Sequence, residues 1–141
     1  MASIAVTTAG SVHVVESIEQ ITLPVGEAIL AGDTLSIDAN GRFVKADADG
    51  AGALALPRAV ATRSCAIYEP VTGIVKGVMT GWTLTAVAYS AAILASDTAG
   101  EITATSSESN GGSADVALGH VIPIWDHLIG GSPEKAIRIN L

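Results

Sequence analysis

The chain has 141 residues, of which 49% are hydrophobic and only 15% are charged, and its 14 acidic and 7 basic side chains give a net charge of −7. This length fits one domain with a hydrophobic core. We do not expect the chain to bind nucleic acid, because it is acidic and has no basic cluster, and polyanion binding requires concentrated Lys and Arg. No apolar run approaches the roughly 18 residues of a membrane-spanning helix, and no signal-peptide pattern opens the chain, so we expect neither a membrane protein nor one exported by its own signal.

The first quarter of the chain shows one clear strand pattern. Residues 1–19 are weakly patterned, with a possible strand at residues 12–15. Residues 20–25 then alternate between apolar and polar side chains until Pro24. Because proline cannot donate to a β-ladder, this strand is expected at the edge of a sheet.

Two short hairpins are predicted around Asp-x-x-Gly turns at residues 38–41 and 97–100. Asp can accept hydrogen bonds from the backbone just downstream and Gly tolerates a positive φ, so each tetrapeptide favours a turn between two strands. Leu35 and Leu94 precede the two turns at the same interval. This repeat indicates a chain built from two similar β-hairpin units.

The middle of the chain contains a strand-like run that is interrupted by glycine. Gly73, Gly77 and Gly81 recur every four residues within a run rich in β-branched side chains. A helix would lose about 1 kcal/mol of stability at each glycine, whereas a strand uses glycine at bulges and where two backbones approach closely. These three positions therefore predict bulges or close approaches between strands.

The end of the chain alternates again. Ile137, Ile139 and Leu141 fall on one face of an extended segment, which is typical of a strand that lies inside a sheet. Many short strands separated by turns have few other ways to share a core than a sandwich or a barrel-like sheet. The sequence therefore predicts a single all-β domain with little helix.

The low charge content of the chain also bears on its surface. Charged residues usually cover about 25–35% of a soluble protein surface, so we infer that part of this surface is buried against copies of the chain or against another protein. The alternative is that Gly, Ala, Thr and Ser simply dilute the charge count of a small β domain.

Several short motifs together resemble the small decoration (cement) proteins of tailed-phage capsids. They are the Ala31-Gly-Asp33 corner, the two Asp-x-x-Gly turns, the Leu118-Gly-His-Val121 stretch and the terminal Ile-Arg-Ile-Asn-Leu141 strand. The resemblance covers residues 20–141. It implies a β-sandwich or β-tulip-like fold and a structural protein without enzymatic activity or cofactor. It also implies a homotrimer at three-fold and quasi-three-fold sites outside an icosahedral head, where it binds the major capsid protein and stabilises the expanded shell.

The same resemblance implies a place and a division of the chain. The protein would be made in the host cytoplasm and end on the exterior of the virion. Residues 1–19 lie outside the resemblance, so we expect them to form an N-terminal arm that reaches a neighbouring protomer or the shell, followed by a single β domain at residues 20–141. Val12 and Val14 are the interface residues expected in this arm.

The other expected interface residues centre on the two tryptophans, Trp82 and Trp125. Tryptophan is over-represented at interface hot spots, where truncation costs about 2 kcal/mol or more. Ile124 and His127 flank Trp125 in a connection, residues 123–131, that departs from the decoration-protein pattern. For both tryptophans the alternative is ordinary packing in a core.

Residues that could carry chemistry show no spacing that supports it. Cys65 is the only cysteine, so no intrachain disulfide can form. The acidic residues near Asp47 lack the ligand spacing of a calcium loop, and His13, His120 and His127 are too scattered for a zinc site. We therefore expect no metal, no cofactor and no catalytic residues.

One alternative function of a different class remains open. The chain could be a small adhesion or carbohydrate-binding β module, similar to a head fibre. This alternative would be favoured if the loop at residues 106–113 and Trp125 lined a cleft together.

Overall fold

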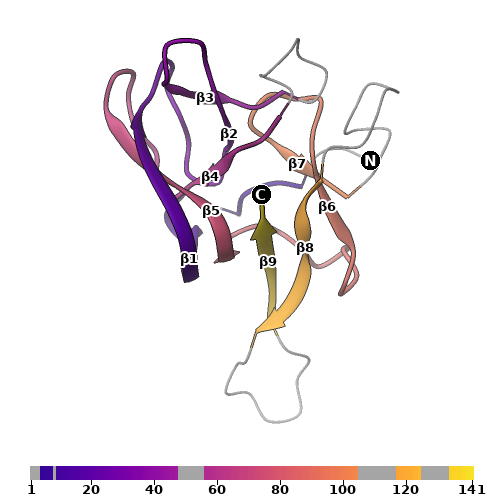
Figure 1. The fold of residues 1–141 in the computed structure, drawn as a ribbon. Coiled ribbons are helices and arrows are strands. Elements are labelled where there is room, and N and C mark those ends of the chain that lie inside the picture. The colour runs from indigo at the N-terminus through magenta and orange to yellow at the C-terminus, as the bar shows by residue number, and fades with distance from the viewer. Residues whose placement is uncertain (1–3, 8, 48–55, 105–116, 125–133) are drawn as a thin grey trace.

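Strand β5 (Pro70–Thr80) organises the sheet, because three other strands pair with it directly. The computed structural model describes residues 4–7, 9–47, 56–104, 117–124 and 134–141 (Figure 1). Its elements are, in chain order, the short 3-10 helix η1 (Ala9–Ser11) and strands β1 (His13–Pro24), β2 (Thr34–Ile37), β3 (Phe43–Lys45), β4 (Ala59–Ala61), β5, β6 (Ala92–Ala95), β7 (Ile102–Thr103), β8 (Ala117–Ile124) and β9 (Glu134–Asn140).

The two edges of β5 are used differently. One edge pairs with β1 along its whole length, and the other is divided, with β4 opposite Gly73 and Ile74 and β9 opposite the four residues from Lys76 to Met79. The strand order is β3-β2-β4-β5-β9-β8-β6-β7, with every strand pair antiparallel. The sheet therefore curls away from β5 in two directions, as Figure 1 shows.

This arrangement confirms the predicted all-β class. The described residues form one curled, sandwich-like antiparallel sheet that contains no α-helix. The final alternating segment is β9, which lies between β5 and β8 with Ile137 and Ile139 buried, so it does end inside the sheet. Pro24 is the last residue of β1. Among the described strands β1 pairs with β5 alone, so it is an edge strand, as Pro24 predicted.

The first half of the sheet closes around its own core. Directly after β1, Val25 forms an isolated parallel bridge with Phe43 of β3, and the amide of Gly26 donates to the Phe43 carbonyl at 2.8 Å. These contacts bring the end of β1 back to β3. The enclosed core consists of Val25, Ile29, Leu35, Phe43, Ala59, Ala61, Cys65 and Val71. Burial raises the pKa of the Cys65 thiol, as expected for a cysteine that only packs.

A second, larger core includes the N-terminal segment together with residues of strands β4 to β9. Ile4 bridges to Ile102 and Val6 bridges to Trp82, while Ile4 and Val12 are buried in this core. The predicted boundary between an arm at residues 1–19 and a domain at residues 20–141 lies inside β1. The described part of residues 1–19 therefore packs against the domain up to Val12 and then continues as a strand of its sheet.

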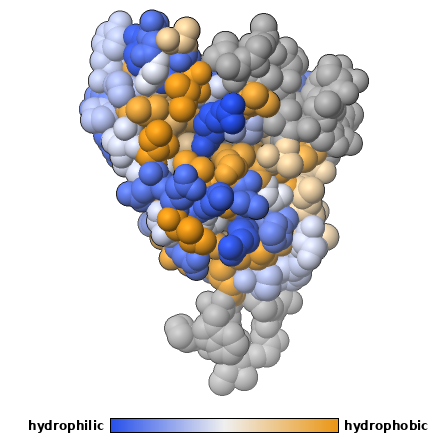
Figure 2. All heavy atoms as spheres, viewed as in Figure 1, coloured by the Kyte–Doolittle hydropathy of each residue, from blue (hydrophilic) through white to orange (hydrophobic). Residues whose placement is uncertain are grey.

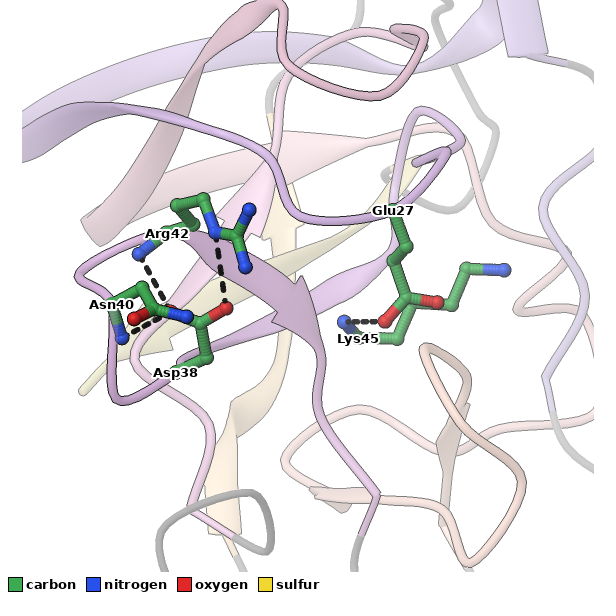
Figure 3. Close-up of polar contacts among 5 residues, drawn as sticks. All are labelled: Glu27, Asp38, Asn40, Arg42 and Lys45. Carbon is green, nitrogen blue, oxygen red and sulfur yellow. Dashed lines mark hydrogen bonds and ion pairs between the residues drawn. The ribbon is translucent and has the colours of Figure 1, made fainter.

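The two predicted hairpins are both present, as β2–β3 and β6–β7. In the first turn, one carboxylate oxygen of Asp38 accepts hydrogen bonds from the amides of Asn40 and Arg42 at 2.8 and 3.0 Å, and Gly41 has φ 77° (Figure 3). Asp38 also pairs with Arg42 at 3.3 Å through its other carboxylate oxygen. This turn uses both Asp and Gly as predicted.

The second turn uses its residues differently. Gly100 has φ 81°, as expected, but the side chain that accepts from the backbone two residues downstream is Ser96, whose hydroxyl receives the amide of Thr98 at 3.0 Å. Ser96, and not Asp97, thus accepts the backbone hydrogen bond that corresponds to the one from Asn40 to Asp38 in the first turn. The two units are therefore similar hairpins, and the second turn is one residue longer than the first.

The two hairpins meet through the backbone of Gly100. Its carbonyl accepts from the Thr34 amide at 2.9 Å, and its amide donates to the Ala46 carbonyl at 2.8 Å. The turn of the second unit is therefore bonded to both strands of the first at their open end. A side chain at Gly100 would also press on Asp33, whose carboxylate lies 3.0 Å from the place of a Cβ.

The middle glycines lie where strands approach closely, as predicted. A Cβ at Gly73 would stand 2.6 Å from the Ala59 Cβ, and one at Gly81 would stand 2.6 Å from the Val12 Cα. A Cβ at Gly77 would overlap the Glu16 carbonyl. The most severe overlap among the described glycines is at Gly119 of β8, where a Cβ would clash with the carbonyl oxygen of Arg138 in the paired strand β9.

Replacing Gly119 tests whether this close approach is required. Gly119→Ala is expected to lower the free energy of unfolding by about 3 kcal/mol or more, because the rigid backbone of β9 must move to admit the methyl group. Gly10→Ala is the matched control, since no atom lies within 4 Å of a Cβ there. Urea unfolding of both variants measures the effect, and similar stabilities would contradict the prediction.

Candidate functional site

The outer edge of β1 is the most exposed strand edge among the described residues. β1 pairs with β5 on one side and with no other described strand, and the eight residues from His13 to Gln20 are all exposed. A long free strand edge presents a row of backbone donors and acceptors to any chain that approaches. We call residues 13–20 the β1 edge.

Two bulges turn apolar side chains outward along the β1 edge. Val14 lies opposite Met79 and Glu16 opposite Val78, which leaves Val15 as an extra residue. In the same way, Ile18 is the extra residue between Ser17 and Glu19. Val15 and Ile18 are 53% and 58% exposed. Bulges commonly re-aim side chains at sheet edges, and here they display two large apolar ones.

Charged residues accompany these apolar side chains. Glu16 and Glu19 lie on the β1 edge beside Val15 and Ile18, and the bulges break the regular ladder between them. Both features discourage indiscriminate strand pairing. On the face drawn in Figure 2, apolar and hydrophilic residues are likewise interspersed. The β1 edge therefore suits a selected partner that offers positive charge and an apolar contact together.

The expected interface residues that the structure describes differ in position and exposure. Val14 is 39% exposed on the β1 edge. Val12 and Trp82 are only 7% exposed and pack in the larger core, so Trp82 occupies the position that the core-packing alternative describes. Ile124 is half-buried at the end of β8, opposite Glu134.

Other expectations fall outside the described residues. They concern Trp125, His127 and the loop at residues 106–113. The cleft that would favour an adhesion module depends on them.

Sequence reasoning missed Val15 and Ile18. A signal for them exists, because apolar and polar residues alternate regularly at residues 20–25 but not at residues 13–18, where Val14 and Val15 are adjacent. A break in alternation within a strand is what a bulge produces.

A groove of about 510 Å³ lies on a different part of the molecule. It runs between the N-terminal segment, the Ala31-Gly-Asp33 corner and the turn before β7. Its lining residues include Ile4, Val6, Leu30, Asp33, Trp82 and Glu101. Leu30 is 60% exposed, and Trp82 is nearly buried.

Asp33 is the most perturbed acid among the described residues. Burial raises its pKa to about 6, even though the Leu30 amide donates to its carboxylate at 2.8 Å and Lys45 lies near enough to oppose the shift. Glu27 and Glu101 add to the increase by repulsion. Figure 3 shows Glu27 accepting a hydrogen bond from the backbone amide of Lys45 at 3.2 Å.

Asp38 shows the opposite behaviour on the neighbouring hairpin. The hydrogen bond from the Arg42 amide, helped by the Asn40 amide and the Arg42 guanidinium, lowers the pKa of its carboxyl. Asp33 therefore favours the protonated state at mildly acidic pH, while Asp38 remains ionised.

The described residues contain no group of three or more His, Cys, Asp or Glu side chains placed to hold a metal ion. Within the same part of the chain, no helix is long and apolar enough to cross a membrane. No protein-family model matches the chain, and no match was found among curated proteins or solved structures.

The opposite shifts of Asp33 and Asp38 predict opposite effects of removing each charge. Because the folded-state pKa of Asp33 lies above the ordinary value of 3.8, its charged form disfavours folding, with the loss growing between about pH 4 and pH 6. Asp33→Asn keeps an acceptor for the Leu30 amide. After a discount for partial exposure, it is expected to raise the free energy of unfolding by ~1 kcal/mol at pH 7.5 and to change it little at pH 4.

Asp38→Asn serves as the comparison. Its lowered pKa means that its charged form favours folding, and this contribution is lost only as the pH falls from the ordinary value of 3.8 toward the lowered pKa. This variant is therefore expected to be less stable at both pH 7.5 and pH 4. Urea unfolding at the two pH values measures both variants. An equal loss of stability in Asp33→Asn at both pH values would show that its charge carries no cost.

Proposed function

We propose that this chain is a capsid decoration protein, which binds the outer face of an icosahedral phage head at three-fold and quasi-three-fold sites and stabilises the expanded shell. Its partners are the major capsid protein and two further copies of itself. The observation that carries the proposal is the β1 edge, which no other described strand covers and which exposes two large apolar side chains in a chain with few charges.

The backbone of the β1 edge supports strand addition by a partner. A strand that pairs with a free edge gains main-chain hydrogen bonds, while side-chain contacts select the sequence that is accepted. Burial of Val15 and Ile18, which are each more than half exposed, would contribute about 1 kcal/mol or more per side chain. This surface is suited to assembly rather than to a small substrate.

The charge of the chain supports a position outside the shell. A net charge of −7 disfavours contact with packaged DNA. Glu16 and Glu19 on the β1 edge favour a partner surface that carries Lys or Arg, since complementary charge speeds encounter and excludes wrong partners. The low total of charged residues is explained if a homotrimer buries part of the surface between its copies.

Self-association is the first test. Light scattering across a dilution series into the sub-micromolar range is expected to give three times the 14.1 kDa mass of the chain. A monomer at every concentration would remove the homotrimer from the proposal and leave head binding to be tested alone.

Head binding is tested on the β1 edge itself. In the double variant Val15→Ser, Ile18→Ser, occupancy on purified heads of the encoding virus is expected to fall at least about tenfold at limiting concentration, which corresponds to the loss of ~1.4 kcal/mol. Ile67→Ser is the matched control, because it removes a comparably exposed apolar side chain outside both β1 and the groove. Sedimentation with heads measures occupancy. Equal occupancy of the wild type and the double variant would contradict the proposed role of the β1 edge.

A further inference from the structure

The groove at the junction of the two hairpin units is a second candidate binding site. Its walls come from three separate parts of the chain: the segment around Ile4, the Leu30–Asp33 corner and the turn that leads to Ile102. Its volume of about 510 Å³ lies within the range of ligand sites, roughly 300–1,000 Å³. It does not include any residue of the β1 edge.

The lining of the groove combines two chemical features. Most of it is apolar, including Ile4, Val6 and Leu30, and the indole of Trp82 forms part of the wall. Among the described residues that line it, the ionisable ones are two carboxylates, Asp33 and Glu101. A ligand that fits both features has an apolar stem and a positive head, and an aromatic wall also attracts cations.

The position of Asp33 is fixed by its surroundings. One carboxylate oxygen accepts from the Leu30 amide at 2.8 Å, and the other lies 3.0 Å from the place that a Cβ of residue 100 would occupy. Because residue 100 is glycine, this second oxygen keeps its space. The corner therefore holds a partly buried negative charge in one orientation at the groove.

We infer that this groove binds a lysine side chain presented by a partner polypeptide, with the stem against the apolar wall and the ammonium near Asp33 and Glu101. Lysine matches the site because its charge is compact and lies at the end of a four-carbon stem. A site of this size accepts the lysine together with neighbouring parts of the partner chain. The inference is independent of head binding, since it is tested on the free protein.

The test uses the indole signal of Trp82 as the reporter. In the Trp125→Phe background, Trp82 is the only tryptophan. Its indole N–H resonance is followed while Nα-acetyl-lysine-N-methylamide is added. The control ligand is the norleucine derivative, which has the same stem without the charge. A saturable shift is expected with the lysine derivative, and binding of the norleucine derivative is expected to be at least about threefold weaker.

Variants of the two carboxylates make the test specific. Asp33→Asn and Glu101→Gln are each expected to weaken binding of the lysine derivative by about threefold, while leaving the norleucine derivative unaffected. Asp38→Asn removes a carboxylate that does not line the groove and is expected to change neither. Retained lysine affinity in both groove variants would overturn the inference, as would equal affinity of the wild type for the two ligands or no saturable shift at all.

The pH dependence provides a second readout. Glu27, Lys45 and Glu101 are the charged groups that act on Asp33, and its pKa of about 6 means that it loses its charge as the pH falls to 5. Lysine binding is therefore expected to weaken between pH 7.5 and pH 5 in the wild type and to weaken less in Asp33→Asn. An equal change in the two proteins would show that the Asp33 charge does not contribute.

Discussion

The divided edge of β5 is the constraint on which the rest of the molecule depends. A strand can pair with only one partner at each point of an edge, so β4 and β9 share this edge end to end while β1 occupies the other. The two parts of the sheet then diverge, and the buried residues form two cores, the larger of which also includes Val60 of β4 and Ile74 of β5. Close backbone approach makes this possible, since the glycines at positions 73 and 77 of β5 leave room that any side chain would fill.

Both candidate sites follow from this divergence. β1 lies along the undivided edge of β5, and no other described strand pairs with its outer side. Where the two halves of the sheet come together again, the turn at Gly100 is bonded to Thr34 and Ala46, and the groove with Asp33 lies beside this junction. The β1 edge offers backbone and apolar contacts, whereas the groove offers shape and negative charge. They would recognise different features of a partner.

The local elements were predictable from sequence because local chemistry determines them. Asp38 and Gly41 specify a turn by hydrogen bonding and a positive φ, and the alternation near Ile137 specifies a strand. The tertiary features were not predictable in the same way. Nothing local distinguishes a core Trp82 from an exposed one, or Ser96 from Asp97 as the capping residue of the second turn. The groove joins segments far apart in the chain, so no local pattern could reveal it.

The position of β9 has a consequence for how the protein is made. β9 fills the second half of the divided edge and also pairs with β8, yet it follows every other described strand in the chain. Synthesis proceeds from the N-terminus, so half of one edge of β5 has no partner until more than fifty later residues have been added and β9 emerges. Closure of the larger core is thus a late, long-range event, and such pairings form slowly. A ribosome that stalls before β9 would hold a chain that lacks the strand lying between β5 and β8.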